Sequence, residues 1–238
     1  MKSPASIVWV TGAGRGIGRA AALAFAADGA CVIASGRTKR TLDAVVKEIA
    51  ARGGLAHAVV CDVRSESSIK NAVKVITRKC GPVDVLVNNA GIGPWKDFLK
   101  TTVREFDDTI STNLRGMFIC TQAVAPSMIA RRRGMIINVL STAAIRPFPG
   151  NSAYCASKFG GLGLTRVIRG ELKKHNIRVV AVLPGAVETP MWDAASRKKY
   201  HERMMQPEDV AAVMVQAARL PARTVVEEIL MRPLAGDI

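Results

Sequence analysis

Short apolar stretches alternate with longer helix-forming stretches along almost the whole chain. The apolar stretches are rich in Val, Ile, Leu and Ala and lack polar alternation, which is typical of parallel strands buried on both faces. We expect strands at 6–10, 30–35, 55–60, 83–87, 134–140, 177–182 and 225–230. We expect helices at 17–28, 38–52, 66–79, 104–131, 152–174 and 207–220. Repeated strand–helix units with right-handed crossovers predict an α/β fold with one doubly wound, parallel, seven-stranded sheet and helices on both faces.

No linker, repeat or low-complexity tract interrupts this pattern, so we expect a single domain over 1–238. One long irregular region spans roughly 184–206. Loops of that length in a compact domain are usually lids or binding loops, which predicts a substrate-binding loop at 186–206. No apolar run approaches the roughly 18 residues of a membrane span, and the N-terminal apolar stretch is too short for a secretory signal.

The cysteines and the net charge restrict the compartment and the partners. Five cysteines, at 31, 61, 80, 120 and 155, occur singly without a C-x-x-C pair. This favours reduced thiols in the cytoplasm over a disulfide framework or a zinc site, so we expect no metal. The net charge of +15 would attract phosphates, acidic carriers or nucleic acid. Because the charge is dispersed and aromatic residues are few, a solvated basic surface is favoured and a nucleic-acid partner is not expected.

A glycine-rich turn follows the first predicted strand and precedes a helix, with the spacing T-G-x-x-x-G-x-G. Glycines let the backbone turn sharply and approach a pyrophosphate, and the helix N-terminus offers free N–H groups to it. This position predicts a Rossmann-type dinucleotide site. Its expected residues are Thr11, Gly12, Gly14, Arg15, Gly16, Ile17 and Gly18. A tight turn that only packs the helix on the strand is the competing explanation.

The second strand is followed by arginine where many dinucleotide sites carry an acid. An Asp or Glu about 20 residues after the glycine turn holds the ribose 2′-OH of NAD, but no carboxylate occurs in 29–42. Arg37, followed by Thr38, instead offers a guanidinium to a 2′-phosphate, and Arg15 is placed to approach the same group. We therefore predict NADP(H) as the cofactor. Exposed charges at a helix start are the competing explanation.

A carboxylate also follows the third predicted strand. Asp62, with Val63 beside it, is placed to reach the adenine amino group of a bound dinucleotide. A helix N-terminal cap is the competing role for Asp62.

A tyrosine and a lysine four residues apart share one helix face. Tyr154 is a phenol with an ordinary pKa of about 10, and the nearby ammonium of Lys158 is expected to stabilise the phenolate and lower that pKa. The pair would form a tunable proton donor or acceptor. Ser141 ends the fifth strand and Asn113 lies within a long predicted helix, where asparagine is a mediocre helix former. A surface pair with no chemistry is the competing explanation for the tyrosine and lysine.

Taken together, these residues resemble the short-chain dehydrogenase/reductase family. The resemblance runs from about residue 6 to about residue 190, with the family's motifs in order. The motifs are Thr11-Gly12-x-x-x-Gly16-Ile17-Gly18, Asn88-Asn89-Ala90-Gly91, Asn113, Ser141, Tyr154, Lys158 and Pro184-Gly185.

The resemblance implies a role for each residue of the catalytic set. Tyr154 would be the general acid in carbonyl reduction and the base in alcohol oxidation, with Lys158 lowering its pKa and binding the nicotinamide ribose. Ser141 would orient and polarise the substrate carbonyl, and Asn113 would hold a water that relays protons from Lys158 to solvent. Further cofactor contacts would come from Asn89, Ala90, Gly91, Pro184, Gly185, Val187 and Thr189.

The resemblance also implies a homo-oligomer, a dimer or a tetramer. Many carrier-protein ketoreductases of the family end in a strand followed by an Asp-Gly-Gly turn, whereas this chain ends V-V-E-E-I-L-M-R-P over 225–233. That departure weakens the case for a fatty-acid ketoreductase.

The predicted activity is hydride transfer between NADP(H) and a small-molecule carbonyl or secondary alcohol. The alternatives are a reductase of 3-oxoacyl thioesters on acyl carrier protein or CoA, and a non-catalytic dinucleotide-binding or redox-sensing protein. The candidate substrate-pocket residues are mostly apolar, which favours a hydrophobic substrate. They are Ile92, Gly93, Pro94, Trp95, Ala143, Ile145, Phe148, Ala186, Val187, Met191 and Trp192.

Two basic runs lie outside these motifs. The run at 197–203 would either meet an anionic substrate or form a solvated lid face, and we favour the second. The run at 131–133 would either dock an acidic carrier or complement the dipole at a helix C-terminus, and again we favour the second.

Overall fold

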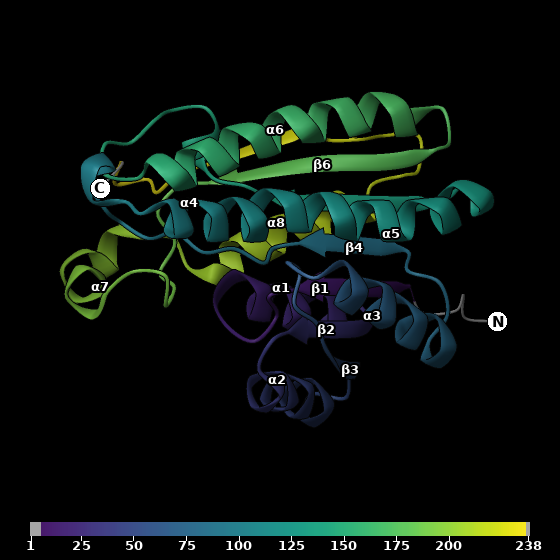
Figure 1. Cartoon of the computed structure of the whole chain (residues 1–238). Helices are drawn as coiled ribbons and strands as arrows, with labels where there is room; N and C mark the ends of the chain where they lie inside the picture. The colour runs from purple at the N-terminus through teal and green to yellow at the C-terminus, as the bar shows by residue number, and fades with distance from the viewer. Residues whose placement is uncertain (1–5, 237–238) are drawn as a thin grey trace.

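The computed structural model describes residues 6–236 and contains one parallel sheet of seven strands in the order β3-β2-β1-β4-β5-β6-β7 (Figure 1). The ends of the predicted domain, 1–5 and 237–238, lie outside the described residues. The strands are β1 Ile7–Thr11, β2 Cys31–Gly36, β3 Leu55–Val60, β4 Val85–Asn88, β5 Gly134–Val139, β6 Ile177–Pro184 and β7 Glu228–Met231. The predicted doubly wound parallel sheet is confirmed, although the last strand starts three residues later than expected.

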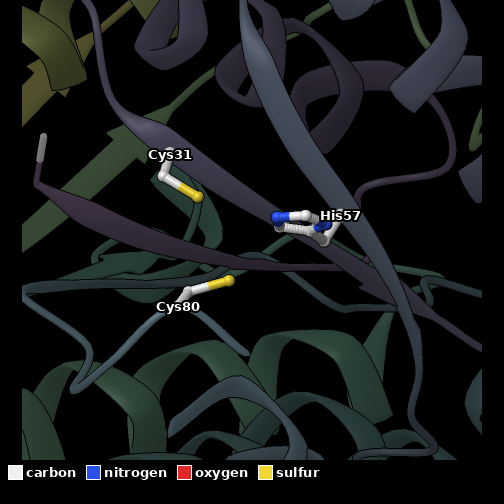
Figure 2. Close-up of side chains that lie close together, drawn as sticks. All are labelled: Cys31, His57 and Cys80. Carbon is white, nitrogen blue, oxygen red and sulfur yellow. The ribbon is translucent and has the colours of Figure 1, made fainter. Parts of the chain in front are cut away.

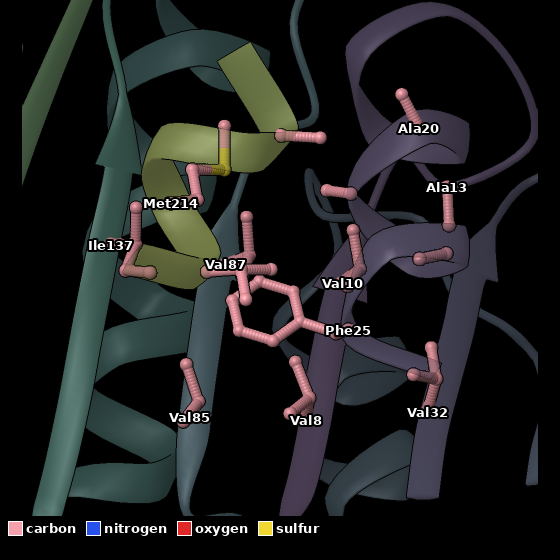
Figure 3. Close-up of a cluster of buried hydrophobic side chains, with 14 of the residues drawn as sticks. Val8, Val10, Ala13, Ala20, Phe25, Val32, Val85, Val87, Ile137 and Met214 are labelled. Carbon is pink, nitrogen blue, oxygen red and sulfur yellow. The ribbon is translucent and has the colours of Figure 1, made fainter. Parts of the chain in front are cut away.

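Helices cover both faces of the sheet because its strands are apolar on both sides. One face carries α1 Gly16–Ala27, α2 Lys39–Ala51 and α8 Pro207–Arg219. The other carries α3 Glu66–Lys79, α5 Gly116–Arg131 and α6 Ser152–Lys173. Alternate residues of β1 point to opposite faces of the sheet. Val8 and Val10 pack in the core under α1, whereas Trp9 packs in the core on the other face. Figure 3 shows Phe25 of α1 among the valines of β1 and β4.

The long helix predicted at 104–131 is two helices. Helix α4, Val103–Ile110, is joined to α5 by a π-helical turn, Ser111–Arg115. Such single-turn widenings are frequent at functional sites, and this one contains Asn113.

The region 186–206 was expected to be irregular and is partly helical. It contains α7, Ala194–Tyr200, and a 3₁₀ turn, His201–Arg203. Asp193 caps α7 by accepting the Ser196 N–H at 2.8 Å. Among the described helices, none is both long enough and apolar enough to cross a membrane.

Candidate active site

A cleft of about 780 Å³ runs across the carboxyl ends of the strands. In a doubly wound sheet, ligands bind at this edge, where loops from neighbouring strands diverge. Its walls are the glycine turn after β1, the ends of β2 to β5 and the loop after β6. Nearly all of the predicted cofactor residues line it, namely Gly12, Gly14, Arg15, Gly16, Ile17, Arg37, Thr38, Asp62, Val63, Asn89, Ala90, Gly91, Tyr154, Lys158, Pro184, Gly185, Val187 and Thr189.

The glycine turn has the shape that a pyrophosphate needs. Gly12 and Gly16 have φ of +65° and +53°, a conformation that side chains disfavour. A Cβ on Gly12 would lie 2.9 Å from the Cα of Ala90, so the neighbouring loop leaves no room for one. Helix α1 starts at Gly16, directly after this turn, so the first N–H groups of the helix have no partner within it and are available to a phosphate at the turn. The residues therefore fit a dinucleotide phosphate.

Thr11 and Gly18 lie behind the cleft and hold its loops together. The Thr11 hydroxyl donates to the Val87 carbonyl at 3.2 Å and accepts the N–H groups of Asn89 and Ala90 at 3.0 and 3.1 Å. The Asn89 amide donates in turn to the Thr11 carbonyl at 3.0 Å. Gly18 packs so closely on Gly12 that a side chain would collide with its backbone. Both predicted cofactor residues are thus placed to shape the site rather than to line it.

The two arginines predicted to bind a 2′-phosphate are exposed at the adenine-side wall of the cleft. Arg15 follows the glycine turn and Arg37 follows β2. Within residues 6–236, neither guanidinium forms a hydrogen bond or an ion pair with another side chain. Both groups are therefore free to bind an anionic ligand in the cleft.

Asp62 lines the cleft and is not a helix cap. Ser65 caps α3 instead, accepting the Ser68 N–H at 3.2 Å. The Asp62 carboxylate binds Arg64 at 2.8 Å. The hydrogen bond from Arg64 lowers the pKa of Asp62, so this acceptor stays ionised at neutral pH.

Tyr154, Ser141 and Lys158 meet at the nicotinamide end of the cleft. Tyr154 and Lys158 lie on the first turns of α6, and Ser141 follows β5. The Ser141 hydroxyl lies close enough to the Tyr154 phenol to lower its pKa. Lys158 is 5% exposed, and its ammonium lies 5.4 Å from the centre of the Tyr154 ring and donates to the Val139 carbonyl at 3.0 Å. The structure thus brings together three of the four predicted catalytic residues around one surface of the cleft.

The pKa values differ from the sequence expectation. Burial raises the pKa of Tyr154, and the Ser141 hydroxyl opposes this only in part. Burial lowers the pKa of Lys158 to about 8. The expected lowering of the Tyr154 pKa by Lys158 is therefore not found in the chain alone, because burial disfavours both charged forms.

Asn113 is 4% exposed and lies behind the cleft. Its amide donates to the Ile92 carbonyl at 2.8 Å and to the Ser157 hydroxyl at 3.0 Å, and its side-chain oxygen accepts the Ile92 N–H at 2.9 Å. It therefore fixes the loop after β4 against α6. A water-sized cavity of about 10 Å³ lies beside it, also lined by Asn88 and Val139.

Most of the candidate substrate residues line the cleft beside Tyr154. The rings of Trp95 and Trp192 lie 5.7 Å apart at its mouth. Gly93 packs on the phenol, since a Cβ there would lie 3.1 Å from the Tyr154 ring. Ile145 was also expected here, but it lies outside the cleft and is 42% exposed, because the backbone has already turned into a 3₁₀ helix.

Neither basic run belongs to the cleft. Arg197 and His201 bind opposite oxygens of Glu188, at 3.0 and 2.9 Å, and so hold α7 on the loop after β6. Arg131 binds Asp84 at 2.7 Å beside the start of β4, at the opposite edge of the sheet.

Fourteen other residues line the cleft that the sequence did not indicate. Several of them lie at a strand end or directly after one, and three come from α4. A strand-end position is the signal that would have marked the first group. They are Gly36, Thr41, Leu42, Cys61, Arg64, Glu105, Asp108, Thr109, Thr112, Val139, Leu140, Thr142, Asn151 and Pro190.

A family model described as short chain dehydrogenase matches residues 6–200. The chain belongs to the short-chain dehydrogenase family. The predicted resemblance is confirmed, and the chain is an oxidoreductase of this family.

Relatives match this short-chain dehydrogenase over nearly its whole length. It is 41% identical to a sepiapterin reductase of Chlorobaculum tepidum, over 98% of each chain. It is 40% identical to a 3-oxoacyl-(acyl-carrier-protein) reductase of Thermotoga maritima, over 90% of this chain and 91% of that one. Among solved structures, a variant of actinorhodin polyketide ketoreductase with NADPH is similar over 100% of both chains, with a TM-score of 0.91 and 32% identity. A metagenomic short-chain oxidoreductase in complex with NADP has a TM-score of 0.85 and 35% identity over 96% of each chain.

Proposed function

We propose that this protein transfers a hydride between NADP(H) and a carbonyl or secondary alcohol, with Tyr154 as the general acid and base. The observation that carries the proposal is the meeting of Tyr154, Ser141 and Lys158 in a cleft whose other end has a phosphate-binding glycine turn. A protein that only binds a dinucleotide needs no such proton donor, which argues against the non-catalytic alternative.

The assignment of NADP(H) rests on the unpaired arginines. Arg15 and Arg37 border the cleft where a 2′-phosphate would lie, and the described chain has no carboxylate in 29–42 to bind a free 2′-hydroxyl. Two similar structures were solved with NADP or NADPH. When bound, the nicotinamide supplies or accepts the hydride.

The side chains of the site supply the proton and hold the carbonyl. Ser141 and Tyr154 donate hydrogen bonds to the carbonyl oxygen, and the Tyr154 proton passes to that oxygen as negative charge develops there. A raised pKa keeps the phenol protonated and ready to donate in the reductive direction. Lys158 remains close enough to stabilise the phenolate that results.

Proton return to Tyr154 is assigned to Lys158 and a water held near Asn113. The 10 Å³ cavity is close to the volume that one water requires. It is lined by Asn113 and by Val139, whose carbonyl accepts from Lys158. The buried Asn88 side-chain oxygen beside it lacks a partner among the described residues, and a water there would satisfy it.

The substrate end of the cleft favours a flat, largely apolar carbonyl compound. Trp95 and Trp192 offer two neighbouring aromatic faces tilted by 32°, and Met191 lies beside Gly93. Asn151 is 4% exposed, lines the cleft and has a side-chain oxygen without a partner in the described chain. This oxygen would accept a donor from the substrate.

Reduction of 3-oxoacyl thioesters is the second candidate, favoured by relatives named as reductases of that class. Its carrier would need a basic surface near the cleft, whereas the 131–133 run lies at the opposite edge of the sheet.

Oxidation of NADPH, followed against sepiapterin, aromatic ketones and 3-oxoacyl thioesters, tests the proposal. We expect turnover with free aromatic carbonyls that exceeds turnover with thioesters, and its loss in Tyr154→Phe. Undiminished turnover in that variant contradicts the role of Tyr154, and preference for thioesters moves the assignment to the second candidate.

We also propose a homo-oligomer and a cytoplasmic location. Large apolar side chains on the outer surface of the α4 to α6 layer are solvent-exposed in the single chain, including Phe106, Phe118, Phe159 and Val167. An apolar surface of this kind is expected to be covered by another subunit. The five free cysteines are consistent with a reducing compartment.

A further inference from the structure

Two cysteines and a histidine meet near the amino ends of strands β2 and β3, whereas the cleft lies at the carboxyl ends. Their ligand atoms, the sulfurs of Cys31 and Cys80 and a ring nitrogen of His57, all lie within 4.8 Å of one another. Figure 2 shows the three side chains pointing toward a common space from separate segments. None of these residues lines the cleft.

The strand register explains why residues so far apart in sequence converge. Cys31 is the first residue of β2. His57 lies in the neighbouring edge strand β3, where it pairs with Ile33 of β2. Side chains two residues apart on a strand share a face, so Cys31, Ile33 and His57 face the same side of the sheet. Helix α3 runs back along that side and ends at Cys80.

We propose that Cys31, His57 and Cys80 form a structural site for a zinc ion. Two sulfurs and one imidazole are the donors that Zn²⁺ prefers, and hard cations such as Mg²⁺ and Ca²⁺ prefer oxygen. In a tetrahedral site with Zn–S of about 2.3 Å and Zn–N of about 2.0 Å, the ligand atoms are roughly 3.6–3.8 Å apart. Each donor therefore needs to move by about 1 Å or less.

The three donors are available for such an ion. Within the described residues, the His57 imidazole makes no hydrogen bond, although histidine ring nitrogens usually find a partner when half-buried. All three side chains are at least half-buried, and Cys31 is 6% exposed. Binding would release the thiol protons to solvent, and a water would complete the fourth position.

A zinc ion here would join the edge strand β3 and the end of α3 to β2. The site is far from the chemistry, since β2 carries the chain about 16 Å from Cys31 to the cleft residue Gly36. We therefore expect zinc to raise the stability of the fold while leaving turnover unchanged.

Zinc titration of the reduced, chelator-stripped full-length protein, read by a competing chromophoric chelator, tests the site. We expect one zinc per chain, with affinity lowered at least tenfold in His57→Ala and in Cys80→Ser. His175→Ala and Cys120→Ala remove a half-buried histidine and a buried thiol outside the cluster and should bind as the unchanged protein does. NADPH binding reports on the fold of every variant.

A second readout does not depend on any variant. Bound zinc should protect Cys80 from alkylation, mapped by mass spectrometry, without altering the labelling of Cys155. Either of two results overturns the proposal. The first is zinc uptake that the His57 and Cys80 substitutions do not weaken. The second is no zinc uptake by the reduced protein, whether or not Cys31 and Cys80 form a disulfide when reductant is removed.

Discussion

At the scale of single residues, the account depends on side chains that the fold withdraws from water. Lys158 is almost fully buried and Tyr154 is partly buried. Burial raises the pKa of Tyr154 and lowers that of Lys158, so it favours the uncharged form of each side chain. The sequence identified both residues, together with Ser141, by their spacing. It could not predict that burial would outweigh the effect of the Lys158 ammonium on the Tyr154 pKa, because desolvation depends on neighbours that are distant in the chain.

The pKa of Lys158 predicts the pH dependence of cofactor capture. Because the ammonium is lost as pH rises through a pKa of about 8, kcat/KM for NADPH should fall above that pH. Lys158→Arg keeps its charge throughout. Its kcat/KM for NADPH should be lower than that of the unchanged protein but should not vary with pH over the same interval. Steady-state rates at varied NADPH and pH measure this, and an identical fall in the arginine variant would contradict the assignment.

Arg37 is expected to determine the choice of dinucleotide. A hydrogen bond to a charged group contributes about 1.5–3 kcal/mol, so Arg37→Ala should lower the ratio of kcat/KM for NADPH to that for NADH by roughly 10- to 100-fold. Arg40→Ala is the matched control, since Arg40 is an exposed neighbour that does not line the cleft. Equal ratios in all three proteins would remove Arg37 from the site.

At the scale of elements, regular periodicity predicted the sheet and most of its helices, and local irregularities were missed. All seven strands lie within a few residues of their expected positions because buried parallel strands leave a continuous apolar signal. The π-turn at Ser111–Arg115 carries no such signal, since a widened turn changes hydrogen bonds without changing composition. Helix α7 and the turn after it are held by the ion pair of Glu188 with Arg197 and the hydrogen bond of Glu188 with His201, which form only in the folded loop.

The glycine turn gives a prediction that separates shape from flexibility. Gly12→Ala should weaken NADPH binding at least tenfold, because the new Cβ would press on Ala90 and the φ of +65° would be strained. Gly53→Ala shares the positive φ but has nothing within 4 Å, so it should lose a comparable backbone energy of about 1–2 kcal/mol while binding NADPH normally. Thermal melts and NADPH fluorescence titrations measure the two effects. Normal binding by the Gly12 variant would show that the turn is not the phosphate site.

At the scale of the whole molecule, the doubly wound sheet places different chemistry at its two edges. The carboxyl ends of the strands hold the dinucleotide cleft, and the amino ends hold the Cys31, His57 and Cys80 cluster. The first arrangement follows from motifs with fixed spacing. The second has no sequence signature, because its residues come from two strands and a helix end and become neighbours only through strand register.

The outer apolar surface of the α4 to α6 layer predicts self-association. Phe159→Glu places a charge where we expect a second subunit, so it should lower the mass measured by analytical ultracentrifugation toward that of one chain. Leu55→Glu changes an exposed residue of the edge strand β3 and should leave the assembly intact. A monomeric parent protein would refute the proposed assembly.

The central claim is that Tyr154 transfers the proton that completes carbonyl reduction, and a single turnover tests it most directly. The protein is saturated with NADPH, mixed with a carbonyl substrate from the panel, and the loss of nicotinamide fluorescence is followed. We predict that Tyr154→Phe binds NADPH with unchanged affinity and turns over about 10²–10⁴-fold more slowly. A rate equal to that of the unchanged protein, with the cofactor bound, would contradict the account.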